Sequence, residues 1–232
     1  MLENLLSTAE AVLFDFDGVL VNSEPYYYRS YNLAFEKRGH SIKEEDYWEY
    51  WTSRGEGIPG EIRRYNLHIS EEEVKAIYQE RCENFTSFCK QGCIEFYPGM
   101  LDVLKDLKNK GMPCAIASSS LEPDILTIFE KAGHAPPPCT VVGRRNGLRP
   151  KPHPDIYVYA AGTLNVEPLK CLVIEDAHKG LEAAKSVQMR CVILKNELNW
   201  NLDYPGADAV IPDHEALARA IQDWIGREKS GS

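Results

Sequence analysis

The sequence predicts an α/β protein in which a doubly wound parallel sheet carries an inserted α-helical segment. Three observations lead to this prediction. Short apolar runs of strand length alternate with segments of helix length along most of the chain. Residues 22–91 interrupt this alternation, because they are rich in aromatic and charged side chains and contain no convincing buried strand. Polar side chains follow several of the apolar runs, at the strand ends where open α/β sheets bind ligands.

The predicted core comprises residues 1–21 and 92–232 and is Rossmann-like. Its expected strands are the apolar runs 11–14, 113–117, 140–143, 171–174, 190–194 and 209–211. Its expected helices are 100–110, 121–131, 155–164, 179–186 and 215–224. Residues 226–232 have the composition of a frayed tail, so we expect the last helix to end before them.

Residues 22–91 are predicted to form a helical insertion, or cap, in this core. Its expected helices are 25–38, 44–51, 59–66 and 70–89. Ser23 suits an N-cap and Pro25 a first helical turn, while Ser70-Glu71-Glu72-Glu73 has the capping-box pattern. The glycines of Arg54–Gly60 indicate a loop. We expect most tyrosines of the insertion to pack between its helices.

Composition restricts the class of protein. The chain has 232 residues, of which 44 % are hydrophobic and 26 % charged, as is ordinary for a soluble globular protein. The net charge of −9 disfavours general affinity for nucleic acid or for anionic membranes. Seven cysteines without a C-x-x-C pair favour a reducing compartment over a disulfide framework. We therefore expect a cytoplasmic protein, and we expect a monomer.

Two aspartates follow the first apolar run of the core. In an extended chain residues i and i+2 point to the same side, so Asp15 and Asp17 can point to one place. Close like charges are costly unless a cation or a proton lies between them, and a hard divalent cation such as Mg²⁺ would satisfy both carboxylates. The alternative is a polar turn in which Asp17-Gly18 serves only as turn chemistry.

Other strand ends carry further polar groups. Ser118 and Ser119 follow the second run, Lys151 precedes a helix, and Glu175-Asp176 ends the run 171–174. Each has a structural alternative: a serine N-cap, a solvated basic turn, and a cap of the following helix. Together they supply carboxylates, hydroxyls and an ammonium group at one sheet edge, a set that suits phosphoryl transfer.

The chain resembles the haloacid dehalogenase-like superfamily in four signatures that stand in the family's order. They are Asp15-Phe-Asp17-Gly-Val, Ser118 after an apolar strand, Lys151-Pro-His-Pro-Asp155 and Ile174-Glu-Asp176. The insertion is similar to the helical cap of the β-phosphoglucomutase-like and sugar-phosphatase branch. The second aspartate, Asp17, argues against the dehalogenases themselves.

The resemblance implies a role for each of these residues. Asp15 would be the nucleophile that forms an aspartyl-phosphate, and Asp17 the general acid and base, with its backbone carbonyl on the metal. Ser118, Ser119 and Lys151 would hold the phosphoryl group. Asp176 would complete the Mg²⁺ shell, with Glu175 as a ligand or close behind it. The Lys151-Pro152 peptide bond is expected to be cis.

The insertion departs from the family pattern in ways that bear on function. Asn22 stands where many relatives have aspartate, and Tyr27 stands where the mutases carry a cap histidine. No lysine occurs in 83–88, where the mutases place one. Arg54 resembles a cap arginine that grips the substrate, and Glu24 is a further candidate cap contact.

These comparisons favour a Mg²⁺-dependent phosphatase of a small phosphorylated metabolite, with a sugar or polyol phosphate as the preferred class. The first alternative is a β-phosphoglucomutase-type isomerase. The second is a catalytically silent binding protein on the same scaffold.

Overall fold

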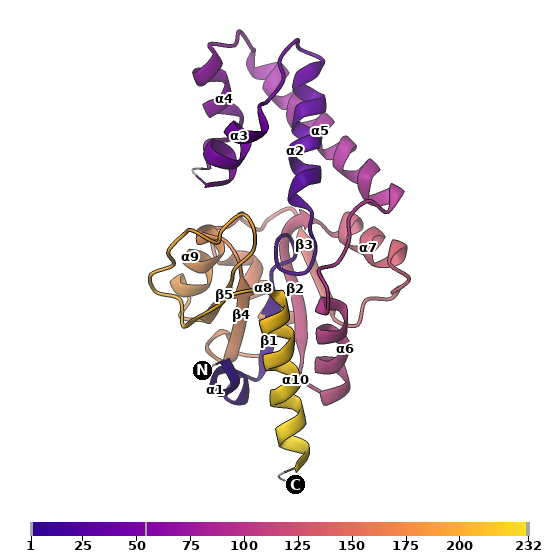
Figure 1. Ribbon diagram of the computed structural model, residues 1–232, viewed down its shortest axis with the longest axis vertical. Helices are drawn as coiled ribbons and strands as arrows, with labels where there is room; N and C mark the ends of the chain where they lie inside the picture. The colour runs from indigo at the N-terminus through magenta and orange to yellow at the C-terminus, as the bar shows by residue number, and fades with distance from the viewer. Residues whose placement is uncertain (1, 54, 231–232) are drawn as a thin grey trace. The chain divides into compact units, whose positions relative to one another are not determined.

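The computed structural model describes residues 2–53 and 55–230 and divides the chain into two compact units (Figure 1). The core unit consists of Met1–Asn22 and Glu95–Ser232, and the helical unit of Ser23–Ile94. Within the described residues, no helix has the length and the apolar character needed to cross a bilayer.

A six-stranded parallel sheet forms the centre of the core unit, in the order β3-β2-β1-β4-β5-β6. The strands are β1 (Ala11–Phe14), β2 (Cys114–Leu121), β3 (Thr140–Arg144), β4 (Cys171–Glu175), β5 (Arg190–Leu194) and β6 (Ala209–Ile211). Phe14 pairs with Ile116 of β2 and with Ile174 of β4, so these three strands end at the same edge. The predicted doubly wound parallel sheet is confirmed.

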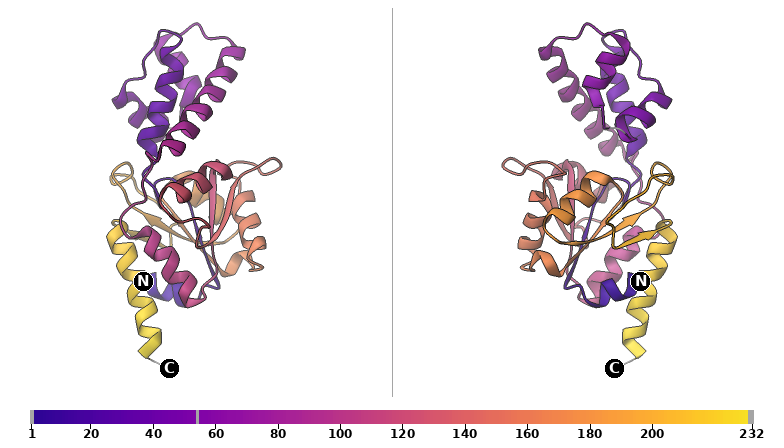
Figure 2. Two further views of the ribbon diagram at one scale, coloured as in Figure 1. Left: turned by 90° about the vertical axis from the view of Figure 1, so that its right-hand side faces the viewer. Right: turned by 90° about the vertical axis from the view of Figure 1, so that its left-hand side faces the viewer.

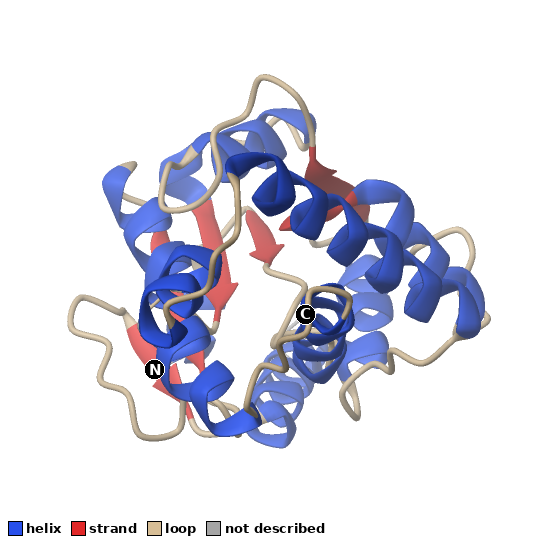
Figure 3. Cartoon of the chain, turned by 90° about the horizontal axis from the view of Figure 1, so that it is seen from above, coloured by secondary structure: helices blue, strands red, loops and turns tan. Residues whose placement is uncertain are grey.

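Helices cover both faces of this sheet (Figure 2). They are α1 (Leu2–Ser7), α6 (Met100–Lys110), α7 (Glu122–Lys131), α8 (Asp155–Thr163), η2 (Pro168–Lys170), α9 (His178–Ser186) and α10 (His214–Ser230). Ala11 and Leu13 share one buried cluster with α8 and α9. Figure 3 colours the strands of this sheet red and the helices of the chain blue. The helices fall on both faces because the connections between parallel strands are right-handed and the strand order runs in opposite directions on the two sides of β1.

The ends of the core unit differ from the sequence prediction in two places. Helix α1 was not predicted, although Leu2 and Leu6 lie one turn apart and are both buried. Helix α10 continues to Ser230, so the expectation of a frayed tail from residue 226 is wrong. Nothing between residues 224 and 230 forces a stop, since Gly226 is a weak helix breaker and the rest are good helix formers.

The helical unit consists of α2 (Glu24–Glu36), α3 (Glu44–Asp46), the π-helix η1 (Tyr47–Ser53), α4 (Gly57–Tyr65) and α5 (Glu71–Gln91). The capping box predicted at the start of α5 is confirmed, with Ser70 and Glu73 bonded reciprocally. Ser23 occupies the N-cap position of α2, but its side chain makes no capping hydrogen bond. The loop predicted over 54–60 is too long, because α4 already begins at Gly57 with Pro59 in its first turn.

Apolar and aromatic side chains hold the helical unit together. Its buried cluster contains Ala34, Phe35, Ile42, Tyr47, Trp51, Ile58 and Ile77. The rings of Tyr28, Tyr31 and Trp48 pack against this cluster, as expected for the aromatic residues of the insertion.

Candidate active site

The carboxyl ends of β1 and β4 bring the first candidate residues together. The backbone N–H of Asp15 donates to the carbonyl oxygen of Ile174 (2.9 Å), which continues the ladder and puts Asp15 beside Glu175. Phe16 points the other way and packs against the rings of Phe96 and Phe129. This alternation leaves Asp15 and Asp17 on one side, at the switch point of the sheet.

Lys151 joins the two strands electrostatically. Its Nζ donates to Oδ1 of Asp15 (2.6 Å) and to Oε1 of Glu175 (2.7 Å), and its side chain is 2 % exposed. Burial lowers the pKa of this ammonium group, but the charges of Asp15 and Glu175 outweigh burial and raise it above its usual value. A solvated basic turn is therefore excluded for Lys151. The Lys151-Pro152 bond is cis, as predicted.

Glu175 is fully occupied by protein donors. Its Oε1 accepts from Lys151 and from the Tyr157 hydroxyl (2.7 Å), and its Oε2 accepts from the backbone N–H groups of Asp176 (2.8 Å) and Ala177 (3.0 Å). A Cβ on Gly180 would lie 1.7 Å from Oε1, so this position requires glycine. Burial opposes ionisation, but Lys151 and these donors bring the pKa of Glu175 below its usual value. Glu175 is thus built to position Lys151 and the loop that follows β4.

Three carboxylates form a possible metal centre. Oxygen atoms of Asp15, Glu175 and Asp176 lie within 4.8 Å of one another. Burial, together with Glu175 and Asp17, raises the pKa of Asp15 to about 7, against the opposing effect of Lys151. Burial and the neighbouring carboxylates also raise the pKa of Asp176 well above its usual value. One ammonium group does not balance three carboxylates, so the donor set suits a divalent cation.

Asp17 has a different environment from Asp15. Its Oδ2 accepts hydrogen bonds from the hydroxyls of Ser118 (3.2 Å) and Ser120 (2.6 Å). Ser118 lies inside β2 and the N-cap position of α7 is Leu121, so the N-cap alternative for Ser118 is wrong. Ser119 is exposed, and the alternation of the strand places its side chain opposite those of its neighbours. The carboxylate of Asp17 therefore lies among hydroxyl donors.

The loop after β5 contributes residues that the sequence analysis missed. Asn196 Nδ2 donates to Oδ2 of Asp176 (2.9 Å) and to the carbonyl oxygen of Gly18 (3.2 Å), which ties two catalytic loops together. The side chains of Asn199 (2.8 Å) and Tyr204 (2.6 Å) donate to the backbone carbonyl of Asp176. The available signal was the run of polar side chains in the segment after a predicted strand, the same kind of signal that identified Ser118.

Gly18 allows this close approach. Its φ is +77°, and a Cβ there would lie 2.1 Å from Oδ2 of Asp176. Any larger residue would push the loops of β1 and β4 apart.

Two candidate residues, Glu24 and Arg54, belong to the helical unit. Glu24 begins α2, and its Oε1 accepts a hydrogen bond from the Tyr47 hydroxyl (3.0 Å). Arg54 lies outside the described residues. Tyr27, at the place of the mutase histidine, stacks on Phe85 with ring centroids 4.0 Å apart.

Comparison with known proteins identifies relatives along nearly the whole chain. The sequence model of the haloacid dehalogenase-like hydrolase family matches residues 9–188. A phosphorylated carbohydrates phosphatase of Thermotoga maritima is 30 % identical over 179 residues, which cover 76 % of this chain and 81 % of the relative.

Three solved structures have the same fold as this chain. CbbY from Rhodobacter sphaeroides, solved with phosphate, has a TM-score of 0.76 and 26 % identity, covering 92 % of this chain and 99 % of that one. A mutant of CbbY was solved with xylulose-(1,5)-bisphosphate. A β-phosphoglucomutase from Clostridium difficile has a TM-score of 0.74 and 25 % identity, covering 96 % of this chain and 99 % of that one.

Proposed function

Because the chain belongs to the haloacid dehalogenase-like hydrolases, we propose that it is a phosphatase that hydrolyses the phosphate ester of a small metabolite. The observation that carries the proposal is the buried Asp15–Lys151–Glu175 arrangement, with Asp176 and Asp17 on either side of it. A sugar or polyol phosphate is the preferred substrate class, since relatives are named for phosphorylated carbohydrates.

Asp15 is the proposed nucleophile. Its carboxylate attacks the phosphorus atom, the bond from phosphorus to the ester oxygen breaks, and the phosphoryl group passes to the Asp15 oxygen. Lys151 favours the ionised form of Asp15 and offers an ammonium group to the oxygens of the transferred group. Ser118, buried within the adjacent strand β2, is a second proposed phosphoryl contact. Ser119 follows Ser118 in the chain, and its side chain points away, so the backbone of Ser119 is the part proposed to contact the phosphoryl group.

Asp17 is the proposed general acid and base. It gives a proton to the departing alkoxide and later takes one from the water that hydrolyses the aspartyl-phosphate, which restores Asp15 and releases phosphate. The hydroxyls of Ser118 and Ser120 fix the orientation of its carboxylate for both steps.

Asp15, Asp176 and the backbone carbonyl of Asp17 are the proposed ligands of a Mg²⁺ ion. When bound, this ion supplies positive charge between the nucleophile and the anionic phosphoryl group. Each carboxylate oxygen of Glu175 already accepts two hydrogen bonds from the protein. We therefore propose that Glu175 positions Lys151 and the loop after β4. Of the two roles that the resemblance implies for Glu175, metal ligand or residue close behind the ligands, we thus propose the second.

The helical unit is the proposed cap that selects the substrate. The groups of the core unit recognise phosphate and metal, which all candidate substrates share, so discrimination requires contacts from elsewhere. Glu24 and Arg54 are the candidates for contacting the part of the substrate beyond the phosphate. The segments that connect the units run side by side within the core unit, where Val21 pairs with Phe96.

Release of inorganic phosphate tests the proposal. The purified full chain is incubated with Mg²⁺ and a panel of phosphorylated sugars, polyols and p-nitrophenyl phosphate, and phosphate is measured. Asp15→Asn serves as the blank for contaminating phosphatases, and Asp102→Asn, which alters an exposed ion pair with Lys105, serves as the matched active control. Equal phosphate release by wild type and Asp15→Asn would contradict the proposal.

A mutase is the second candidate function, and the similarity to a β-phosphoglucomutase motivates it. The same incubations distinguish it, because a mutase yields an isomeric sugar phosphate where a phosphatase yields free sugar and phosphate. Tyr27 favours the phosphatase, since a phenol exchanges protons less readily than an imidazole near neutral pH.

A further inference from the structure

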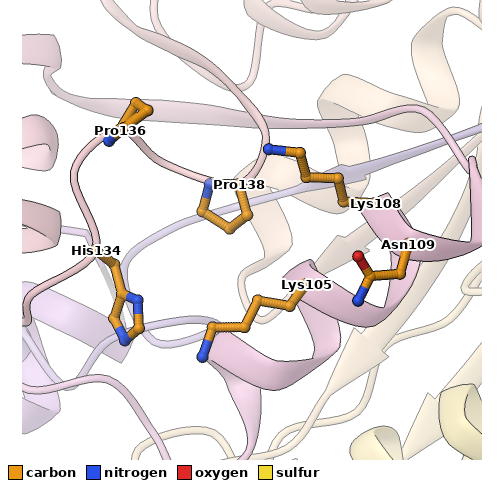
Figure 4. A pocket seen from close by; sticks show the side chains of 6 residues that line it. All are labelled: Lys105, Lys108, Asn109, His134, Pro136 and Pro138. Atoms are coloured by element: carbon orange, nitrogen blue, oxygen red, sulfur yellow. The ribbon is translucent and has the colours of Figure 1, made fainter.

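A cavity of about 350 Å³ lies in the core unit at the amino-terminal edge of the sheet, the edge opposite the candidate active site. Helix α6 and the segment before β3 form it, and its lining residues are Lys105, Lys108, Asn109, His134, Pro136 and Pro138. Figure 4 shows the two lysine side chains and the imidazole around this space. Lys105 forms an ion pair with Asp102 (3.1 Å), so the positive charge of this cavity comes mainly from Lys108, on a protein whose net charge is −9.

Two cysteines stand beside the cavity. Ala115 of β2 pairs with Thr140 of β3, so the preceding residues, Cys114 and Cys139, are neighbours at the start of these strands. Adjacent parallel strands lie about 4.8 Å apart, which falls within the Cα separation of a disulfide. Both thiols are free, and their side chains interact directly. Cys114 is buried whereas Cys139 is half-buried.

The surroundings favour thiolate chemistry. The hydrogen bond from Cys139 lowers the pKa of Cys114 below its usual value, and the charge of Lys108 acts in the same direction. Lys108 also lines the cavity, and Pro138, another lining residue, directly precedes Cys139. Reactive cysteines are found in such electropositive and partly exposed places.

We propose that Cys114 and Cys139 form an oxidisable thiol pair, which small anionic disulfides reach through the basic cavity and convert into an intramolecular disulfide. Cys114 ionises more readily than Cys139, because the hydrogen bond between them lowers the pKa of Cys114 and, with burial, raises that of Cys139. The Cys114 thiolate, its proton lost to solvent, displaces one thiolate from the reagent and forms a mixed disulfide. Cys139 then gives its proton to solvent, attacks the Cys114 sulfur and displaces the second thiolate. Overall two cysteine thiols are oxidised to one disulfide, and one reagent disulfide is reduced to two thiols.

Peptide mapping tests the pairing. The reduced full chain is treated with oxidised glutathione, quenched with iodoacetamide and digested with trypsin. Cleavage after Lys110, Lys131 and Arg144 places Cys114 in peptide 111–131 and Cys139 in peptide 132–144. We expect these two peptides linked as the main disulfide product, and a rise of roughly 3–10 °C in the melting temperature of the oxidised protein.

Two variants control for the other cysteines. Cys139→Ser should abolish the linked peptides and the rise in melting temperature. Cys93→Ser changes another half-buried cysteine, in the helical unit, and should leave both results unchanged. A main product that links other cysteines, or that stays as a mixed disulfide with glutathione, would overturn the proposal.

The charge of the reagent tests the route through the cavity. We expect oxidised glutathione, which is anionic, to oxidise the pair at least about threefold faster than cystamine, which is cationic. Lys108→Gln should remove this preference, whereas Lys37→Gln, in the helical unit, should keep it. Equal or faster oxidation by cystamine in the wild type would contradict the route. This inference is independent of the proposed phosphatase activity, since its readouts are peptides and melting temperatures.

Discussion

The two units each bury a cluster of charged groups, and the clusters differ in their balance. In the helical unit Glu61 is completely buried and accepts from His40 (2.8 Å), Trp51 (3.0 Å) and Arg64 (3.1 Å). In the core unit one ammonium group, that of Lys151, faces the carboxylates of Asp15 and Glu175, with Asp176 close by. The first cluster buries one carboxylate among three protein donors, and one of these donors, Arg64, also pairs with the partly exposed Glu56. The second cluster places three carboxylates around one ammonium group and so carries surplus negative charge.

This difference separates a structural network from a functional one. A buried charge whose donors are all protein groups stabilises a particular packing, and its loss exposes unpaired partners. Surplus charge of one sign is costly in the isolated protein and is retained where a ligand balances it. The comparison therefore predicts opposite effects of substitution in the two clusters.

Removal of the Asp15 carboxylate should give the largest effect on activity. Asp15→Asn keeps the shape of the side chain but removes the proposed nucleophile, so phosphate release should fall by about 10⁴-fold or more. The melting temperature of the metal-free protein should stay equal or rise, because the substitution relieves the crowding of like charges. Steady-state kinetics and calorimetry on the same preparation measure both.

The opposite result for Asp15→Asn would contradict the distinction between the two clusters. If Asp15→Asn lost several degrees of melting temperature and little activity, the core cluster would be structural like that of the helical unit.

Removal of Glu61 should produce the converse result. Glu61→Ala takes the acceptor from the buried Trp51 N–H and from His40, and it leaves Arg64 with Glu56 alone, so it should destabilise the helical unit by about 3–5 kcal/mol. Hydrogen exchange of peptides from α2 to α5 measures this, and the exposed Glu72→Ala on α5 should change it by less than about 0.5 kcal/mol. Turnover of p-nitrophenyl phosphate by the core unit should change much less. Unaltered exchange in Glu61→Ala would show that the network contributes little to stability.

Mg²⁺ should stabilise the folded protein by binding at the carboxylate cluster of the core unit. At a Mg²⁺ concentration of about 100 times its Kd, the ion should stabilise the folded protein by about 2.7 kcal/mol. Asp176→Asn should remove most of this stabilisation, because it deletes a proposed ligand, while Asp102→Asn should retain it. Thermal unfolding at increasing Mg²⁺ measures the effect. Full stabilisation of the Asp176→Asn protein would place the ion elsewhere.

The sequence was most informative where chemistry coincides with the ends of strands. Asp15, Ser118 and Glu175 each follow an apolar run, and parallel strands bring such ends together whatever the details of packing. The alternation of apolar runs and helices likewise predicted the order of elements in the core unit.

The remaining contacts depend on tertiary geometry that no local pattern encodes. Ser120 reaches Asp17 because β2 continues beyond the predicted strand, and Asn196 reaches Asp176 across two loops. Helix α4 begins among glycines and a proline, where packing of Ile58 in the buried cluster overrides a sequence typical of a loop.

Arg54 should give the smallest effect and the most selective one. If the helical unit supplies substrate contacts, Arg54→Ala removes one charge-assisted contact of about 1.5–3 kcal/mol, and kcat/KM for the best phosphorylated metabolite should fall roughly tenfold or more. Turnover of p-nitrophenyl phosphate should hardly change, since this ester offers little beyond its phosphate for an arginine to bind. Glu72→Ala removes an exposed charge on α5 of the same unit, and as the matched control it should affect neither substrate. Equal losses on both esters would mean that Arg54 acts on the phosphoryl group or on folding, and the division of labour between the two units would then have to be redrawn.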